Sequence, residues 1–127
     1  MSRALATNGG LLEALGGVSP APIFDANGGA TSPVKDNALA VQLNTVARII
    51  AARNHAKVNV KRQVFFVALG GFDHHDNLIT DHPAKLKLVA DALSQFDQDL
   101  GALNVRDQVT TFTASDFGRT MTSNGNG

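Results

Sequence analysis

The sequence predicts an α/β fold, in which a partial parallel sheet is flanked by helices. Two runs, at residues 63–69 and 109–113, have the apolar and β-branched composition of strands. A segment with helical periodicity precedes each run, and helices between strands are typical of parallel sheets. We treat residues 1–127 as a single partial domain, with a helix and flexible loop over residues 1–36 and an α-β-α-β core over residues 37–127.

The composition is that of a globular chain. Hydrophobic residues make up 43% of the 127 residues and charged residues 17%, so the chain can bury a core. Eleven basic side chains balance eleven acidic ones, and Tyr and Trp are absent, so we expect no nucleic acid partner. No apolar run reaches the length of a membrane span. Because the chain has no cysteine, any metal ion must be held by His, Asp, Glu or backbone oxygen.

The first half of the chain predicts two helices separated by a loop. Apolar residues within residues 1–15 are interrupted by two glycines, which indicates a broken helix. Residues 16–36 are rich in Gly, Pro, Ser and Asn, and predict a flexible loop. Residues 37–53 predict an amphipathic helix, capped by Asp36 or Asn37. Its apolar stripe consists of Leu39, Leu43, Val46 and Ile50, widened by Ala40, Ala47 and Ala51.

The second half predicts a strand, a helix and another strand. After Gln63, the predicted strand over residues 63–69 is continuously apolar, which is typical of a strand buried on both faces. A polar loop over residues 72–82 follows, and Pro83 suits the first turn of a helix that ends near Leu100. The β-branched residues 109–113 predict the second strand. The solvated face of the helix is expected to carry Asp91, Asp97 and Asp99.

A polar loop follows each predicted strand. These loops span residues 70–77 and 115–120. In open parallel sheets, the carboxyl ends of neighbouring strands meet at one edge, and ligands bind there. If the two predicted strands are neighbours, the two loops therefore face each other.

The first loop holds two carboxylates and two imidazoles within four residues. Asp73 and His75 are two positions apart, so their side chains would point the same way in an extended segment. One carboxylate and one imidazole on one side suit Zn²⁺ or Mn²⁺. The alternative is a polar turn with solvated side chains. His82, just before Pro83, is expected to serve as a loop or cap residue.

The second loop combines an acid with a guanidinium. Asp116 follows the strand directly enough to reach a ligand, and Arg119 can hold an anionic group through its planar fork. The alternative is that Ser115 or Asp116 caps a turn, with Arg119 solvated. The spacing of these residues does not decide between the two interpretations.

Four stretches of the sequence carry a resemblance to a known family: residues 43–53, 62–73, 75–77 and 107–120. Their most specific elements are the loop motifs Gly-Gly-Phe-Asp-x-His and Ser-acid-Phe-Gly-Arg-Thr. On these motifs the chain resembles the domain-of-unknown-function family 1501, placed in the alkaline phosphatase/sulfatase-like superfamily. The resemblance covers residues 37–127 and extends more loosely to the first predicted helix.

The resemblance implies a fold, a chemistry and a location. The superfamily fold is a parallel sheet between helices, so the chain is expected to be an internal fragment of an alkaline phosphatase-like fold. Characterised relatives cleave phosphate or sulfate esters with metals bound at strand ends. Many members of the family are exported through a twin-arginine signal, which implies a periplasmic or exported protein, although this chain shows no such signal.

The resemblance also implies roles for individual residues. Asp73, His75 and Asp116 match motif positions and become the candidate ligands of a divalent metal, Zn or Mn. His74 stands where the family usually has Thr and is an additional ligand candidate. The substrate-binding candidates are Arg119 and Asn77, and Asn124 matches a family position whose role is unassigned.

Two functions follow as hypotheses. The first is a fragment of a metal-dependent phosphate- or sulfate-ester hydrolase, with a small anionic ester as substrate and no activity alone. The alternative is a non-catalytic exported binding or scaffolding protein. Family members continue past the Asn-Gly segment into an Asp-His-Gly element, and this chain stops before it. Unpaired strand edges in such a fragment predict self-association.

Overall fold

Two long helices dominate the protein. The computed structural model describes residues 36–56, 58 and 60–125, together with Glu13, Ala14 and Gly16, which are helical. The helices with described bounds are α2 (Ala38–Ala51), η1 (Ala52–Asn54), α3 (Leu78–Ala102) and η2 (Arg106–Gln108), where η denotes a 3-10 helix. The expected helix over residues 1–15 and loop over residues 16–36 lie mostly outside the described residues, although Gly16 is helical rather than in the loop.

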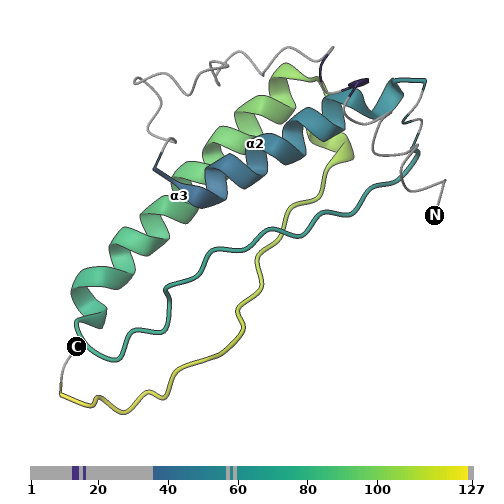
Figure 1. The fold of residues 1–127 in the computed structure, drawn as a ribbon. Helices are drawn as coiled ribbons and strands as arrows, with labels where there is room; N and C mark the ends of the chain where they lie inside the picture. Colours follow the sequence, from purple (N-terminus) through teal and green to yellow (C-terminus); the bar gives the residue numbers. More distant parts are fainter. Residues whose placement is uncertain (1–12, 15, 17–35, 57, 59, 126–127) are drawn as a thin grey trace.

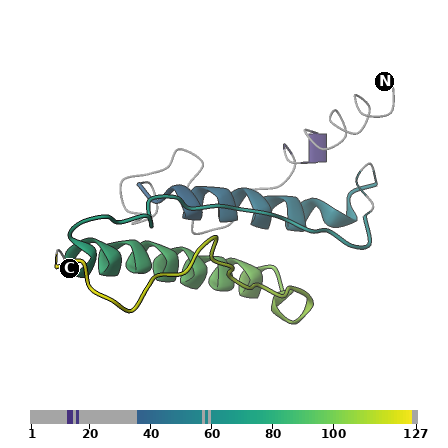
Figure 2. The same ribbon diagram turned by 90° about the horizontal axis from the view of Figure 1, so that it is seen from below.

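The helices run in the same direction, and each is followed by an extended segment that returns along them. α2 and α3 lie side by side, and both extended segments lie on the same side of this helix pair (Figures 1 and 2). The first segment, residues 60–73, connects α2 to α3, and the second, residues 109–124, follows η2. The alternation of helices and extended segments is therefore as predicted.

The predicted parallel sheet is not present. The part of the chain that the structure describes contains no strand, and residues 63–69 and 109–113 are extended without pairing. The α/β class is thus wrong for these residues, which form a helical layer with two extended segments against it. A segment with high strand propensity forms a strand only when its backbone N–H and C=O groups pair with a neighbouring strand. Among the described residues, no backbone hydrogen bond joins the two extended segments.

The first extended segment is buried on one face only. Val67 and Leu69 pack against the helical core, whereas Val64 and Phe66 are 97% and 92% exposed. The prediction of a strand buried on both faces is therefore wrong. A continuous apolar run indicates burial on both sides only if a second layer covers the outer side, and no described residues form that layer.

Asn37 starts α2 and also joins it to α3. Its Oδ1 accepts hydrogen bonds from the backbone N–H groups of Leu39 and Ala40, at 3.1 and 3.3 Å, which satisfies two donors that the first helical turn leaves free. Its Nδ2 donates to the carbonyl oxygen of Leu88 on α3, at 2.6 Å. Asn37 is also buried. The N-cap of α2 is therefore Asn37 and not Asp36, the other residue predicted to cap it.

The core lies between α2 and α3. The predicted stripe of α2 is confirmed, because all four of its large apolar residues are buried. Three alanines in the contact, Ala40, Ala47 and Ala92, are 1% exposed and let the two helices approach closely. The buried cluster consists of Leu39, Ala40, Leu43, Val46, Ala47, Ile50, Ala92, Phe96, Leu100 and Val105. Burial of this apolar surface is the main force that holds the described residues together.

Helix α3 begins earlier than predicted. It starts at Leu78, so residues 78–82 are helical rather than part of a loop, and Pro83 lies inside the helix. Asn77 precedes the helix with φ of 56°, and its carbonyl oxygen accepts from Thr80 and Asp81. Pro83 is the sixth residue of the helix, beyond the first turn, so α3 forms without the backbone hydrogen bond from residue 83 to Ile79.

Asp99 is buried, contrary to the prediction that it is solvated. Its exposed fraction is 0%, and it accepts a hydrogen bond from Nε2 of Gln95 at 3.3 Å. Its Oδ2 atom has no partner among the described residues. Burial raises the pKa of this carboxyl above its ordinary value of 3.8, and the Gln95 hydrogen bond partly opposes that shift. Asp99 lies three residues after Phe96 and seven after Ala92, which places it on the buried stripe.

The described helices do not include a membrane span. None of them combines the length and the apolar character needed to cross a bilayer. This finding agrees with the absence of a long apolar run in the sequence.

Candidate functional site

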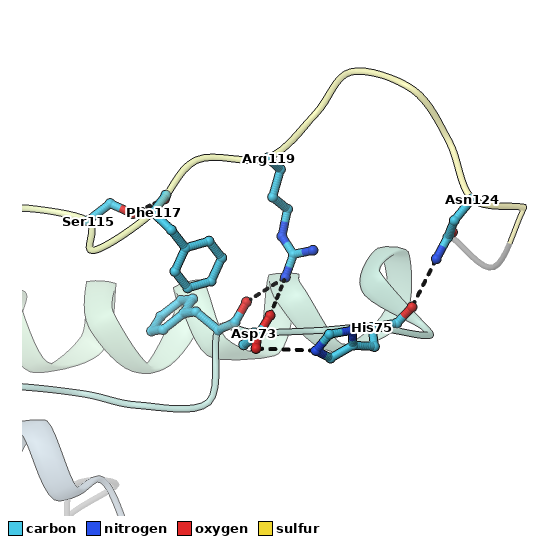
Figure 3. Close-up of polar contacts among 7 residues, drawn as sticks. Asp73, His75, Ser115, Phe117, Arg119 and Asn124 are labelled. Carbon is cyan, nitrogen blue, oxygen red and sulfur yellow. Dashed lines mark hydrogen bonds and ion pairs between the residues drawn. The ribbon is translucent and has the colours of Figure 1, made fainter.

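The loop over residues 70–77 is shaped by one glycine. Gly71 has φ of +85°, a conformation that side chains disfavour, and it turns the chain from the extended segment toward α3. The ammonium group of Lys85, on α3, donates to the carbonyl oxygen of Gly70 at 3.4 Å. This turn presents the next side chains to the second extended segment (Figure 3).

Asp73 and His75 point the same way, as their spacing predicts. The Nε2 atom of His75 lies 3.2 Å from Oδ2 of Asp73, where an imidazole N–H donates to the carboxylate. Both side chains are largely exposed, 83% for His75 and 70% for Asp73. Solvent therefore screens their interaction, and an incoming ion or ligand can reach both.

Arg119 reaches across from the second loop. Its Nη2 atom donates to the carbonyl oxygen of Phe72 at 2.8 Å and lies 3.9 Å from Oδ1 of Asp73 (Figure 3). The guanidinium carbon lies 5.6 Å from the centre of the Phe117 ring, within cation–π range. Arg119 is therefore held between the two loops rather than fully solvated.

Asn124 makes the second connection between the loops. Its Nδ2 atom donates to the carbonyl oxygen of His75 at 3.0 Å. Within the second loop, Ser115 Oγ donates to the carbonyl oxygen of Phe117 at 2.6 Å, so Ser115 closes a local turn. The two loops do face each other, although no sheet brings them together. Arg119 of the second loop, and Asn124 four residues after it, bind backbone oxygens of the first loop.

Not all predicted site residues join this group. Asp116 is exposed, and the structure describes no contact between it and Asp73 or His75. Asn77 contributes its carbonyl oxygen to the start of α3, and no described contact links its side chain to Arg119. Across the described residues, no group of three or more His, Asp or Glu side chains is placed to hold a metal ion.

His74 packs on the helix instead of toward Asp73. Its ring lies 5.7 Å from that of His82, edge to face, and His82 lies 5.8 Å from Phe72. The Nε2 atom of His74 and the Nδ1 atom of His82 are buried without a hydrogen-bond partner among the described residues. Sequence reasoning missed the contact with His82 because it placed that residue in a loop.

The Asp73 and His75 atoms have a separation that suits a shared metal. Two atoms bound to one tetrahedral zinc ion at about 2.0–2.2 Å lie roughly 3.3–3.6 Å apart. The Oδ2 and Nε2 atoms are 3.2 Å apart. The two atoms now point at each other along the hydrogen bond, so a zinc or manganese ion would bind both only after the exposed His75 ring turns to direct Nε2 at a point off that line. The residues present fit two ligands of such an ion, and the remaining ligands have to come from elsewhere.

A cavity lies away from these loops. It has a volume of about 270 Å³ and sits between the C-terminal half of α3 and the start of the second extended segment. Its lining residues are Leu93, Phe96, Asp97, Leu100, Arg106, Val109 and Thr111. Arg106 is occupied there by Asp97, to which its Nε atom donates at 2.8 Å. This cavity is thus separate from the candidate site, whose Asp73 and His75 side chains are largely exposed.

A family model described as "Protein of unknown function (DUF1501)" matches residues 20–127, most of the chain. The chain belongs to the DUF1501 family. This match confirms the family that the loop motifs indicated, and it includes both helices and both loops of the DUF1501 chain. Neither the curated proteins nor the solved structures gave a significant match.

Proposed function

We propose that this DUF1501 chain supplies two ligands of a divalent metal site in a hydrolase of phosphate or sulfate esters. The observation that carries the proposal is the pair of Asp73 and His75, whose Oδ2 and Nε2 atoms are exposed and 3.2 Å apart. A guanidinium beside this pair adds a positive charge, since Arg119 lies 3.9 Å from Asp73. The resemblance of the loop motifs to the alkaline phosphatase/sulfatase-like superfamily supports the ester chemistry.

Each residue has a distinct role in this proposal. Asp73 and His75 hold the ion, zinc or manganese, and His74 and Asp116 remain ligand candidates from the motif. When bound, such a metal polarises the ester oxygen and stabilises charge on the leaving group. A guanidinium has five N–H donors, and Arg119 uses Nη2 for its hydrogen bond to Phe72 and its approach to Asp73. Its other donors are available to orient an anionic ester, together with the Asn77 side chain.

The number of ligands limits what residues 1–127 can do alone. A catalytic zinc site usually has three protein ligands and an open position, whereas the described residues bring two together. We therefore expect metal binding without turnover. Release of phosphate or sulfate from aryl esters by purified residues 1–127, above a metal-only blank, would contradict this part of the proposal.

Metal titration tests the site directly. We expect residues 1–127 to bind one zinc or manganese ion weakly in calorimetry, and both Asp73→Asn and His75→Gln to abolish that binding. The matched control is Asp107→Asn, because Asp107 is an exposed acid on η2, away from the loops. Unchanged affinity in Asp73→Asn would overturn the proposal. In a DUF1501 protein with the further ligands, the substitution matching Asp73→Asn should abolish ester cleavage.

The second candidate function is a non-catalytic binding or scaffolding protein, exported as the resemblance implies. The observation that favours it is that Arg119 and Asn124 both bind backbone oxygens of the other loop. These contacts tie two segments into one surface without any metal ion. A DUF1501 protein that binds no transition metal and cleaves no ester, yet loses loop order in Arg119→Ala, would support this candidate over the hydrolase. Recovery of the protein from the periplasm would test its location.

A further inference from the structure

The basic and acidic side chains of this chain are separated along the sequence. Residues 37–72 contain no Asp or Glu, whereas residues 73–107 contain more acidic than basic side chains. The basic side chains of residues 37–72 are Arg48, Arg53, Lys57, Lys61 and Arg62. Such an asymmetry within a neutral chain indicates a surface that binds an anionic partner.

Three of these cations lie where α2 ends and the first extended segment begins. Arg53 lies on η1, directly after α2. Lys61 and Arg62 are exposed and directly precede residues 63–69. The cations therefore stand beside the apolar run of this segment.

The acids at this end do not balance these cations. α3 and η2 end at the same end of the helix pair as α2 (Figure 1). Arg106 of η2 pairs with Asp97 of α3 at 2.8 Å, so their two charges offset each other. Asp107 adds one exposed acid on η2. Positive charge is therefore in excess where the first extended segment begins.

The first extended segment turns one side away from the helices. Side chains of an extended chain alternate between its two faces, and Val67 and Leu69 pack on the core. The alternation places Arg62, Val64 and Phe66 on the opposite side. Val64 and Phe66 are 97% and 92% exposed. This side therefore carries a cation followed by two uncovered apolar side chains.

The second extended segment adds a phenyl ring. Val109 packs against the core, and Phe112, an odd number of positions later, points away from it and is 83% exposed. Both segments lie on the same side of the helix pair (Figures 1 and 2). We call Arg62, Val64, Phe66 and Phe112 together the outer face.

We propose that the outer face binds the surface of an anionic phospholipid bilayer. Lys61 and Arg62 attract the lipid phosphates, and Val64, Phe66 and Phe112 enter the boundary between the headgroups and the acyl chains. The strength of such binding grows with the apolar area that enters this boundary and with the attraction of basic side chains to anionic lipids.

The chemistry of the outer face favours a bilayer over a protein or a nucleic acid. A nucleic acid offers phosphates to Lys61 and Arg62 but no hydrocarbon to Val64. A protein partner needs a shape that matches the face and its own acids beside the cations. A bilayer presents phosphates and hydrocarbon at neighbouring depths, and its lipids adapt to the side chains that enter.

The acids of the two loops set the orientation on the bilayer. Asp73 and Asp116 lie toward the other end of the extended segments, where anionic headgroups repel them. The end with Lys61 and Arg62 therefore lies deepest, and the loops stay in water. The inference does not depend on whether Asp73 holds a metal ion.

Charge substitutions test the attraction to lipid phosphates. Arg62→Gln should weaken binding to vesicles of equal parts phosphatidylglycerol and phosphatidylcholine roughly fivefold in co-sedimentation. The matched control is Lys87→Gln, which removes the same charge from α3, where Lys87 pairs with Asp91. It should change the affinity less than about twofold. Vesicles of phosphatidylcholine alone should bind the natural chain at least roughly tenfold more weakly.

An apolar substitution tests the entry into the bilayer. Phe66→Ser should weaken binding to the same anionic vesicles roughly fivefold or more, because the phenyl ring no longer leaves water. The matched control is Ile79→Ser, since Ile79 is apolar and 77% exposed but lies on α3. It should leave the affinity nearly unchanged. Circular dichroism checks that both variants keep the helices.

A single tryptophan reports the surroundings of the outer face, because the natural chain has no Trp or Tyr. We expect Phe66→Trp to emit as a solvated indole in buffer. Its emission should shift to shorter wavelength when the anionic vesicles are added, and brominated acyl chains should quench it. Ile79→Trp should show neither change.

Three outcomes would overturn the proposal. One is equal binding to vesicles with and without phosphatidylglycerol, which would show that the cations do not direct it. Another is no vesicle binding, with Phe66→Trp solvated in buffer, which would show that the face stays uncovered. The third is Phe66→Trp already shielded in buffer, which would show that a second copy or another part of the chain covers the face.

Discussion

Gln42 and Ala68 form a two-way contact in which one side-chain amide takes the place of a neighbouring strand. Ala68 N–H donates to Oε1 of Gln42 at 3.1 Å, and Nε2 of Gln42 donates to the Ala68 carbonyl oxygen at 2.9 Å. Through this contact, α2 holds the first extended segment by its backbone. The contact explains how an extended segment without strand pairing keeps its place along the helix.

The contribution of this contact can be measured by removing the amide. We expect Gln42→Ala to lower the free energy of unfolding by about 0.5–1.5 kcal/mol, the usual net value of a protein hydrogen bond. The Ala68 amide should also exchange faster with solvent. Val41→Ala is the control, because Val41 is the preceding, half-exposed residue of α2. Equal exchange of the Ala68 amide in both variants would show that the contact does not hold the segment.

Two adjacent glycines, Gly70 and Gly71, precede Asp73, and only Gly71 has a backbone conformation that requires glycine. Gly71 has φ of +85°, and a Cβ there would lie 2.6 Å from Nζ of Lys85. Gly70 has no atom within 4 Å of such a Cβ. We expect Gly71→Ala to destabilise the protein by about 1–2 kcal/mol through backbone strain, and Gly70→Ala to be close to neutral. Urea titration of the two variants measures the difference, and equal midpoints would contradict it.

The two loops should separate when Arg119 is removed. Arg119→Ala loses the 2.8 Å hydrogen bond to the Phe72 carbonyl oxygen and the charge beside Asp73. We expect amides of residues 72–75 to exchange roughly two- to tenfold faster, the equivalent of one hydrogen bond. Arg62→Ala, which removes an exposed arginine outside the loops, should leave these amides unchanged. Unaltered exchange in Arg119→Ala would show that the loops are held by other contacts.

Asp99 should make the protein less stable as the pH rises. Burial raises the pKa of the folded-state carboxyl above 3.8, so the folded state binds the proton more tightly than the unfolded state. Stability from this group is complete below pH 3.8 and is lost as the pH rises through the raised pKa. We expect Asp99→Asn to be more stable at neutral pH, on the order of 1 kcal/mol, because no buried charge remains.

The pH dependence distinguishes the effect of removing the Asp99 charge from a stabilisation by Asp99→Asn that is the same at every pH. The advantage of Asp99→Asn should shrink toward zero in urea titrations below pH 3.8, where Asp99 is neutral in both states. Asp91→Asn is the control, because Asp91 lies on α3 and pairs with Lys87 at 2.7 Å on the surface. An advantage of Asp99→Asn that is independent of pH would contradict the argument.

The loop motifs predicted which side chains of the candidate site lie close together for some residues but not for others. The spacing of Asp73 and His75 predicted that the two side chains point together, and they do. The order of elements predicted that the loops meet if the two strands are neighbours, and Arg119 and Asn124 join them. The place of Asp116 depends on how the second loop turns after an unpaired segment, which no local pattern records. Its role as a ligand stays a prediction.

The sequence by itself determined that residues 37–53 and the stretch from Pro83 to Leu100 are helical, because the signals of these helices are local. The three- and four-residue spacing of apolar side chains and the cap at Asn37 lie within a few positions of the helix that they start. Only the tertiary structure decided that residues 63–69 remain unpaired and that Asp99 is buried. Strand pairing and burial depend on which distant segment lies alongside, and the β-rich composition of a segment does not contain that information.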